Sequence, residues 1–244
     1  METEEYQRMF EVEDRHWWFR ARQRIVLGLL RRYADPSQAS GLCVDVGCGT
    51  GALLAALGER GMGVDFAPAG LGFCRRRGLR RLTRATATAL PLPASCAAAV
   101  FLLDVLYHRE VTDGETALRE AHRVLKPGGL LILTDPAFPF LYGYHDRAVH
   151  GARRYSSAEV SGQLQRAGFK VLRCGYYNFF LFPVALAVRL IRKIFPAAEN
   201  SASDVVLPPA PLNALLTAVF GAEAALLSRF TFPFGLSVLA VARK

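Results

Sequence analysis

The side chains best placed for chemistry surround one glycine-rich turn. In the stretch VDVGCGTGA, residues 44–52, glycines allow the backbone to turn sharply and to approach a ligand closely. A helix that starts there directs its first amides at the same ligand. Two carboxylates accompany the turn: Asp45 stands just before it, and Asp65 ends the next apolar run. The second position is suited to two ribose hydroxyls, so these residues predict a site for a ligand that carries a ribose.

The glycines alone would also fit a dinucleotide. Gly47, Gly49 and Ala52 satisfy the spacing G-x-G-x-x-A of pyrophosphate-binding turns. Asp45 argues against that ligand, because its carboxylate would repel a nearby pyrophosphate. The same carboxylate could orient a cationic ligand through water or an amide. The pattern therefore favours a ligand other than a nicotinamide dinucleotide.

Strands and helices alternate around this turn. The segment 114–129 is typical of an amphipathic helix that ends at Lys-Pro-Gly-Gly. The alternation predicts an α/β fold with an open parallel sheet and helices on both faces. Short apolar runs that indicate buried strands lie at 42–46, 61–66, 97–108, 130–136, 170–177 and 235–244, and the stretch 79–93 indicates a weak third strand followed by a loop.

Composition indicates a globular protein with one buried core. The 244 residues are 52% hydrophobic and 21% charged, which does not suit a disordered chain. The net charge of +9 could attract phosphates, nucleic acid or an anionic membrane, but we expect most arginines to be solvated surface. Five scattered cysteines without a CxxC motif predict neither a disulfide framework nor a zinc site. With no secretory signal in the acidic first residues, we expect a cytoplasmic protein.

Five motifs in this order resemble the class I S-adenosylmethionine-dependent methyltransferases. They are VDVGCGTG, GVDFAPAGL, ATALPLP, LLDVLYH and LKPGGLLILTDP. The resemblance implies S-adenosylmethionine as cofactor and no metal. It also implies a Rossmann-like, seven-stranded, mainly parallel sheet with an antiparallel last strand. The core would comprise residues 41–176 plus 235–244, with an N-terminal helical lid at 1–40 and a helical insertion at 177–234.

The same resemblance assigns the cofactor site. Thr86 stands where the family often has an acidic residue, which weakens the expected contact to the adenine amino group. Asp104, at the end of the fourth strand, would face the methyl group and the acceptor. The implied set is Asp45, Gly47, Cys48 and Gly49 toward the methionine part, Asp65 on the ribose, Phe66 and Ala87 at the adenine, and Asp104.

Two tryptophans stand side by side in HWWFRARQR, residues 16–24. A bacterial subgroup of the family begins with a similar Trp-Phe-x-x-Arg stretch. By that likeness Trp18 or Phe19 would cover the cofactor cleft and Arg22 would reach the methionine carboxylate. The alternative is that Trp17 and Trp18 anchor the N-terminal helix to the sheet.

The loop after the fifth strand is the expected acceptor site, because ligands bind at the carboxyl ends of parallel strands. We predict His145, oriented by Asp146, as a base, with His108 as a further catalytic candidate. Arg153 or Arg154 would hold an anionic group bidentately. The alternative is a polar loop that salt bridges hold to the rest of the domain. The expected acceptor contacts are Tyr144, His150, Arg153, Arg154 and Tyr155.

The insertion at 177–234 contains two apolar helical segments. It could cap the acceptor site, contact a membrane peripherally, or form a homodimer. We favour a cap, and hence a bulky, partly apolar acceptor. We expect methyl transfer to an oxygen of this acceptor, in a hydroxyl or a carboxylate group. The acceptor would be a small molecule, a lipid-linked intermediate or a peptide natural product. Two alternatives remain: an RNA methyltransferase, which the lack of interleaved aromatics disfavours, and a non-catalytic cofactor-fold subunit.

Overall fold

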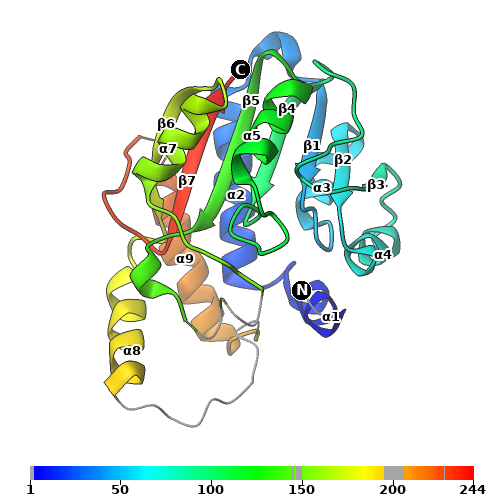
Figure 1. Cartoon of the computed structure of the whole chain (residues 1–244). Coiled ribbons are helices and arrows are strands. Elements are labelled where there is room, and N and C mark those ends of the chain that lie inside the picture. The colour runs from blue at the N-terminus through cyan, green and yellow to red at the C-terminus, as the bar shows by residue number, and fades with distance from the viewer. Residues whose placement is uncertain (1–2, 144–145, 147–149, 195–205, 228) are drawn as a thin grey trace.

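A single seven-stranded sheet organises the computed structural model of the chain (Figure 1), which describes residues 3–143, 146, 150–194, 206–227 and 229–244. The strand order is β3-β2-β1-β4-β5-β7-β6. Strand β7 runs antiparallel to both of its neighbours, and the other pairs are parallel. This confirms the predicted α/β fold with its antiparallel last strand. The strands are β1 (Leu42–Val46), β2 (Gly61–Asp65), β3 (Leu82–Arg84), β4 (Ala97–Leu103), β5 (Leu125–Pro136), β6 (Lys170–Tyr177) and β7 (Ser237–Arg243).

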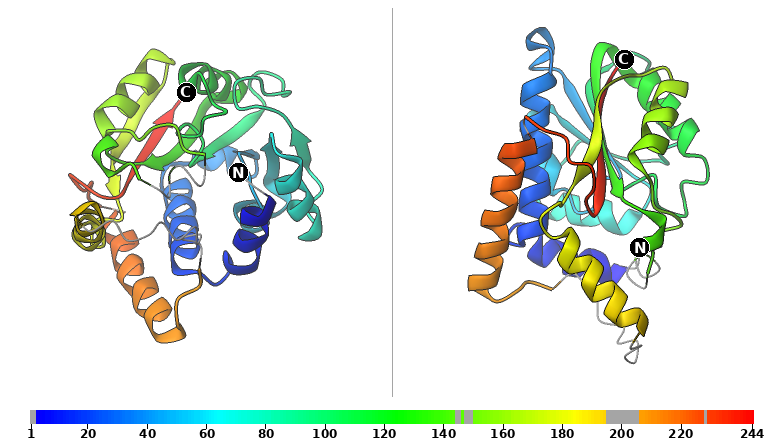
Figure 2. Two further views of the ribbon diagram at one scale, coloured as in Figure 1. Left: turned by 60° about the horizontal axis from the view of Figure 1, so that its bottom comes forward. Right: turned by 90° about the vertical axis from the view of Figure 1, so that its left-hand side faces the viewer.

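The central strands are apolar throughout because helices cover both of their faces. On one face, α5 (Gly114–Val124) and α7 (Ser157–Arg166) pack on the sheet through residues such as Leu118 and Leu164. On the other face lie α2 (Trp17–Tyr33), α3 (Ala52–Leu57) and α9 (Ala210–Leu227). The right-hand view of Figure 2 shows α2 and α9 on one side of the strands and α7 on the other.

Strand order decides where a ligand can bind. The chain passes from β1 outward to β2 and β3, and then returns to β4 on the other side of β1. At such a switch point the connections leave a crevice beyond the carboxyl ends of the strands. The glycine turn after β1 and the segment after β4 therefore meet at one edge of the sheet.

The N-terminal segment contributes both to the core and to this edge. Helix α1 (Thr3–Val12) packs against α4 (Pro68–Arg76), where Tyr6 contacts the cluster that contains Phe73. Helix α2 begins with His16 as its N-cap. Its later residues Ile25 and Leu29 are buried against the sheet. Only α1 and the first turns of α2 thus have the position expected of the 1–40 lid.

The insertion contains α8 (Phe182–Ile194) and α9, as predicted. Helix α9 packs along α2, and Phe220 is fully buried between them and the sheet. Glu223 of α9 accepts hydrogen bonds from the backbone amides of Asn178, Phe179 and Phe180. The buried carboxylate therefore fastens α9 to the end of β6. Short 3-10 helices in the described part of the chain lie at Pro36–Gln38, Gly58–Arg60 and Pro139–Leu141.

Candidate functional site

A cavity of about 540 Å³ lies between the carboxyl edge of the sheet on one side and α1 with the first turns of α2 on the other. This volume is in the range of small-molecule and cofactor sites. The residues predicted to bind the cofactor come together here although they are spread over 87 positions of the chain, from 18 to 104. All of them line the cavity: Trp18, Arg22, Asp45, Gly47, Cys48, Gly49, Asp65, Phe66, Ala87 and Asp104.

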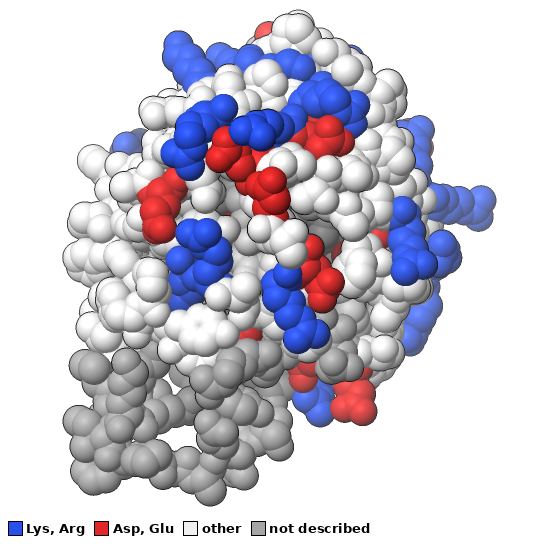
Figure 3. Space-filling view, in the orientation of Figure 1, with Lys and Arg blue, Asp and Glu red and all other residues white. Residues whose placement is uncertain are grey.

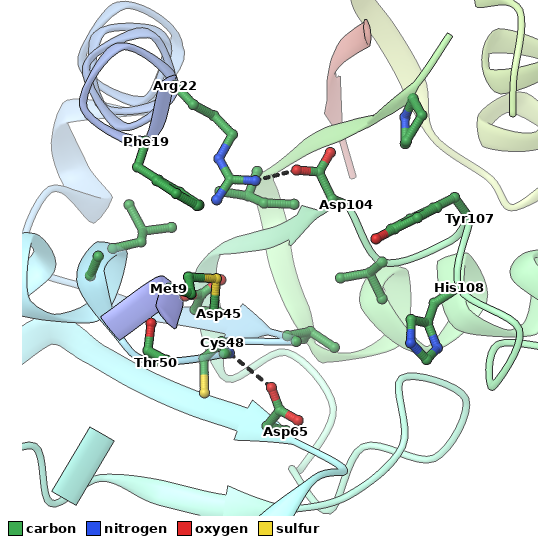
Figure 4. A pocket seen from close by; sticks show the side chains of 18 of the residues that line it. Met9, Phe19, Arg22, Asp45, Cys48, Thr50, Asp65, Asp104, Tyr107 and His108 are labelled. Atoms are coloured by element: carbon green, nitrogen blue, oxygen red, sulfur yellow. Dashed lines mark hydrogen bonds and ion pairs between the residues drawn. The ribbon is translucent and has the colours of Figure 1, made fainter. Parts of the chain in front are cut away.

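The glycine turn has a backbone that side chains would obstruct. Gly47 and Gly49 have φ values of +75° and +55°, in the left-handed region that favours glycine. A Cβ on Gly47 would lie 2.6 Å from a methyl carbon of Val105. Asp65 accepts hydrogen bonds of 2.8 Å from the amides of both Gly49 and Ala67, and the first of these is drawn in Figure 4. The carboxylate thus holds the turn in place at the edge of the cavity.

Burial makes the two aspartates chemically unusual. Asp45 is 3% exposed, and burial raises its pKa to about 7, against an opposing effect of Arg22. Burial also raises the pKa of Asp65, although three backbone hydrogen bonds favour its charged form. A cation placed beside these carboxyl groups would relieve that cost. The open glycine turn and the destabilised carboxylates fit the ribose and the positively charged methionine part of S-adenosylmethionine.

The cavity is acidic although the chain is basic. Its negative lining would attract a sulfonium cation and repel phosphate groups. The acidic residues of the lining are Glu5, Glu13, Asp45, Asp65, Asp104, Glu110 and Asp146, and its arginines are Arg22 and Arg154.

Arg22 and Asp104 form an ion pair across the cavity, as Figure 4 shows. Asp104 follows β4 with a φ of +57°, and Thr134 of β5 donates a hydrogen bond of 3.3 Å to its carboxylate. The guanidinium of Arg22 lies 5.6 Å from the ring centre of Phe19. In this arrangement Arg22 therefore neutralises Asp104. Its predicted role at the methionine carboxylate stays a prediction.

His108 lies at the far end of the cavity from the glycine turn. Burial, aided by nearby positive charge including His150, lowers the pKa of its imidazole to about 4. Its Nδ1 accepts a hydrogen bond of 3.3 Å from the amide of Glu110. The neutral ring then carries its proton on Nε2 and can donate a hydrogen bond from that atom. His108 is therefore better suited to donate a hydrogen bond than to act as a base.

The loop after β5 differs from the prediction in several respects. Tyr144 and His145 lie outside the described residues. Asp146 forms a buried ion pair with Arg154, with bonds of 2.8 and 3.1 Å, so its described partner is Arg154. This pair borders the cavity. Because two nitrogens of the Arg154 guanidinium already bind Asp146, Arg154 cannot hold an anionic substrate bidentately through them.

The remaining predicted acceptor contacts are also employed elsewhere. Arg153 is half exposed, lies 3.3 Å from Glu159 and stacks over the ring of Tyr155. Tyr155 is buried, and its hydroxyl donates to the carbonyl of Leu106. Neither residue lines the cavity. His150 has a φ of +59° and its ring centre lies 6.0 Å from that of His108. These contacts support the alternative of a polar loop tied to the domain.

Sequence reasoning predicted a lid at 1–40 but named no residue of α1 in the site. Tyr6 and Met9 of α1, and Glu13 just after it, line the cavity. Glu13 is held there because Arg77 pairs with its carboxylate at 2.6 Å and Thr50 of the glycine turn donates a hydrogen bond to it. The alternation of polar and apolar residues in α1 indicated a helix but did not identify which of its side chains would face the cavity.

The two tryptophans satisfy both hypotheses made for them. Both line the cavity. Trp18 stacks on Tyr177 of β6 with ring centres 5.7 Å apart, and Trp17 contacts Phe220 of α9 at 5.2 Å. They therefore form a wall of the cavity and anchor α2 to the neighbouring elements at the same time.

The helices of the insertion stay behind this wall. Among the described residues of α8 and α9, none lines the cavity. Of the described residues between 177 and 234, Asn178 lines the cavity, and Leu236 and Ser237, which also line it, belong to the core segment that follows the insertion. The expected cap over the acceptor site is thus not seen in the described part of the insertion.

Comparison with known proteins agrees with this geometry. Residues 44–133 match the family described as "Methyltransferase domain". A demethylmenaquinone methyltransferase of Thermus thermophilus is 40% identical over 102 residues, which are 38% of this chain and 46% of the relative. The chain thus matches only about half the length of such relatives.

Solved structures share the fold at low identity. An S-adenosylmethionine-dependent methyltransferase from Thermotoga maritima is 21% identical. The match covers 99% of this chain and 95% of that protein, with a TM-score of 0.59. The cyclase SpnF is 22% identical over 90% of this chain and 80% of its own, with a TM-score of 0.56. Together with the glycine turn and the paired aspartates, these matches show a methyltransferase domain at residues 44–133, in a fold that the chain shares with S-adenosylmethionine-dependent methyltransferases.

Proposed function

We propose that the chain transfers a methyl group to an oxygen atom of a bulky, partly apolar acceptor of low molecular mass. A lipid-linked intermediate or a peptide natural product would suit this description. The observation that carries the proposal is the single cavity in which the cofactor residues adjoin a second set of walls. Those walls come from Tyr107, His108, Val111, Pro136 and Leu236.

When bound, S-adenosylmethionine supplies a methyl group on a positively charged sulfur. The residues of this chain then have to align the acceptor and exclude water, and alignment alone can contribute roughly 7 to 11 kcal/mol. The aromatic wall of Trp17 and Trp18 and the buried turn below α1 would exclude water. Asp104, at the end of β4, lies between the two parts of the cavity and would position the reacting groups.

The acceptor end offers hydrogen-bond donors but no strong base among the described residues. Burial and the neighbouring Asp104 raise the pKa of Tyr107 far above its ordinary value, so its phenol stays protonated. His108 is neutral and donates from Nε2. Two donors suit an acceptor with a carboxylate, whose oxygen is already deprotonated and reacts without a general base. Within the oxygen class we therefore favour a carboxylate.

An apolar small molecule is favoured over RNA for two reasons. The cavity lining is acidic, which would repel a phosphate backbone. The arginines at the end of α4 are engaged in packing, since Arg76 stacks over Phe10 and Phe73, and Arg77, which follows the helix, pairs with Glu13. The relatives are named demethylmenaquinone methyltransferases, and we extend a small-molecule acceptor to this chain as part of the proposal.

The test uses cofactor with a labelled methyl group, the purified protein, and fractions of a cell extract. We expect the label in the organic-soluble, non-nucleic-acid fraction and expect mild alkali to release it as methanol, as for a methyl ester. Asp65→Asn should abolish the label through loss of cofactor binding. Tyr107→Phe should lower turnover with cofactor affinity retained.

Other outcomes would point elsewhere. Label in RNA would establish the nucleic-acid alternative. Alkali-stable label would refute the carboxylate acceptor. If the cofactor raises the melting temperature but no fraction accepts label, the chain would be a cofactor-fold protein without methyl transfer, and the proposal would fail.

A further inference from the structure

The exposed apolar side chains of this protein gather in the insertion. Of the twelve large apolar side chains that are exposed among the described residues, nine come from residues 177–234. In Figure 3 the left-hand flank, where the loop after α9 runs in Figure 1, is almost free of charged residues. Single exposed apolar residues are ordinary, but a concentration in one segment marks an interaction surface. The nine are Phe180, Val184, Val188, Val206, Leu212, Leu215, Leu226, Phe230 and Phe234.

Helix α9 is the centre of this surface. Its 18 residues contain one charged residue, Glu223, and that carboxylate is buried on the end of β6. The outward side therefore presents only apolar and small residues, with Leu215 60% exposed. Figure 2 shows α9 as the outermost layer on its side of the sheet, with no described element over it. A surface helix ordinarily has a polar outer face, and α9 lacks one.

Basic residues border the apolar helix. A groove of about 610 Å³ runs between α2 and α9, and the described residues of its lining include Arg15, Arg20 and Arg24 but no carboxylate. The guanidinium of Arg24 reaches over Gly221 of α9, since a Cβ there would lie 3.5 Å from its Nη1. Three cations without an acidic partner in the groove are complementary to an anionic ligand.

We propose that α9 docks the protein onto an anionic lipid bilayer, with its outer face in the interface and Arg15, Arg20 and Arg24 against lipid phosphates. An apolar helix face flanked by arginines is the pattern of interfacial membrane binding. Anionic leaflets attract such basic residues across the headgroup region. The inference is independent of the reaction that the cavity performs.

The helix lies on the membrane and does not span it. Among the described helices α9 alone is long and apolar enough to cross a bilayer, and 17% of it is buried in the protein. Crossing would pull Phe220 from its contacts with Trp17 and Trp18 and break the three hydrogen bonds to Glu223. Those contacts keep the inner side of α9 on the protein and leave only its outer side for lipid.

A second copy of the chain is a poorer occupant. A two-fold dimer brings the same patch of each copy together. Each copy would bring the three arginines of its groove to the interface, and the described lining of the groove has no carboxylate that could pair with them. Lipid phosphates supply the missing negative charge, which is why we commit to the bilayer.

The test is flotation of the full-length protein with vesicles of phosphatidylcholine alone or with phosphatidylglycerol added. We expect binding to the anionic vesicles and much weaker binding to the neutral ones. Arg20→Gln with Arg24→Gln should lower the partition coefficient about 30-fold, from about 1 kcal/mol for each arginine near the surface. The matched control is Arg31→Gln with Arg32→Gln, which removes the same charge from the other end of α2 and should bind like the wild type.

A second variant tests the apolar part. Leu212→Ser with Leu215→Ser changes two exposed side chains, so the fold should persist, and the cofactor-induced rise in melting temperature verifies this. We expect its flotation to fall while its net charge is unchanged. Equal flotation of the two arginine double variants, no flotation of the wild type, or a stable dimer by light scattering that the leucine variant dissolves would each overturn the proposal.

Discussion

Asp45 is predicted to destabilise the cofactor-free protein in return for a site that attracts a cation. Its carboxyl group is 3% exposed, and burial raises its pKa from 3.8 to about 7. Replacing it by Asn keeps the shape of the side chain and removes the charge. We therefore expect Asp45→Asn to stabilise the cofactor-free protein at alkaline pH and to weaken its binding of S-adenosylmethionine.

The size of the effect follows from the pKa. Because the folded pKa lies above the unfolded one, the folded protein favours the protonated form of Asp45. The stability that belongs to this form is fully present below pH 3.8 and is lost as the pH rises through about 7. A carboxyl group moved this far costs the folded, ionised protein at most about 4 kcal/mol. Near pH 5 the folded group is protonated, and the cost falls to roughly 1.5 kcal/mol. The gain from Asp45→Asn should therefore be larger near pH 8 than near pH 5 by about 2 to 3 kcal/mol.

Urea unfolding followed by circular dichroism at both pH values measures this difference. Asp14→Asn is the control, because the side chain of Asp14 is 63% exposed and its replacement should change stability little at either pH. Titration calorimetry with S-adenosylmethionine supplies the second readout. The reasoning is refuted if Asp45→Asn destabilises the protein near pH 8, or if it changes stability equally at both pH values.

Three further predictions concern the site and its supports. Asp65→Asn removes the carboxylate that receives the amides of Gly49 and Ala67; equilibrium dialysis should show cofactor affinity at least tenfold weaker, and unchanged affinity would exclude Asp65 from the site. Arg154→Met leaves the buried carboxylate of Asp146 without its partner and should cost about 3 to 5 kcal/mol in the free energy of unfolding; a loss below 1 kcal/mol in urea titration would contradict the buried pair. Because the pKa of His108 is lowered to about 4, its ring stays neutral from pH 6 to 9. The pH dependence of turnover should therefore be the same in the wild type and in His108→Gln. A rise of turnover with pH that is lost in His108→Gln would establish the histidine as a base.

The fold and the residues that gather at the cavity were predictable because their signals are local. An apolar run followed by glycines specifies a buried strand and a turn through the conformations that the backbone allows, and Asp65 follows at a fixed place one strand later. These features hold whatever the rest of the chain does. The antiparallel β7 and the insertion before it were likewise visible, since two strand patterns enclose a segment far too long for a hairpin.

The acceptor side was harder to predict because it depends on pairing between distant side chains. Asp146 stands next to His145 in sequence, yet its carboxylate faces Arg154, because a buried guanidinium needs both oxygens of a carboxylate. His108 has the residue type of a base, but burial and the amide of Glu110 make it a hydrogen-bond donor. Residue type indicated chemistry in each case, and the surroundings decided which chemistry is available.

The sequence by itself determined the α/β order, the glycine turn and the two aspartates predicted to bind a ribose and a cation. Only the tertiary structure decided which side chains of α1 line the cavity, that Glu223 fastens α9 to β6, and that no described element covers the outer face of α9. The physical reason is that backbone conformation and hydrophobic periodicity are encoded within a few residues. Burial, pKa and the choice of charge partner are set by groups that meet only when the chain has folded.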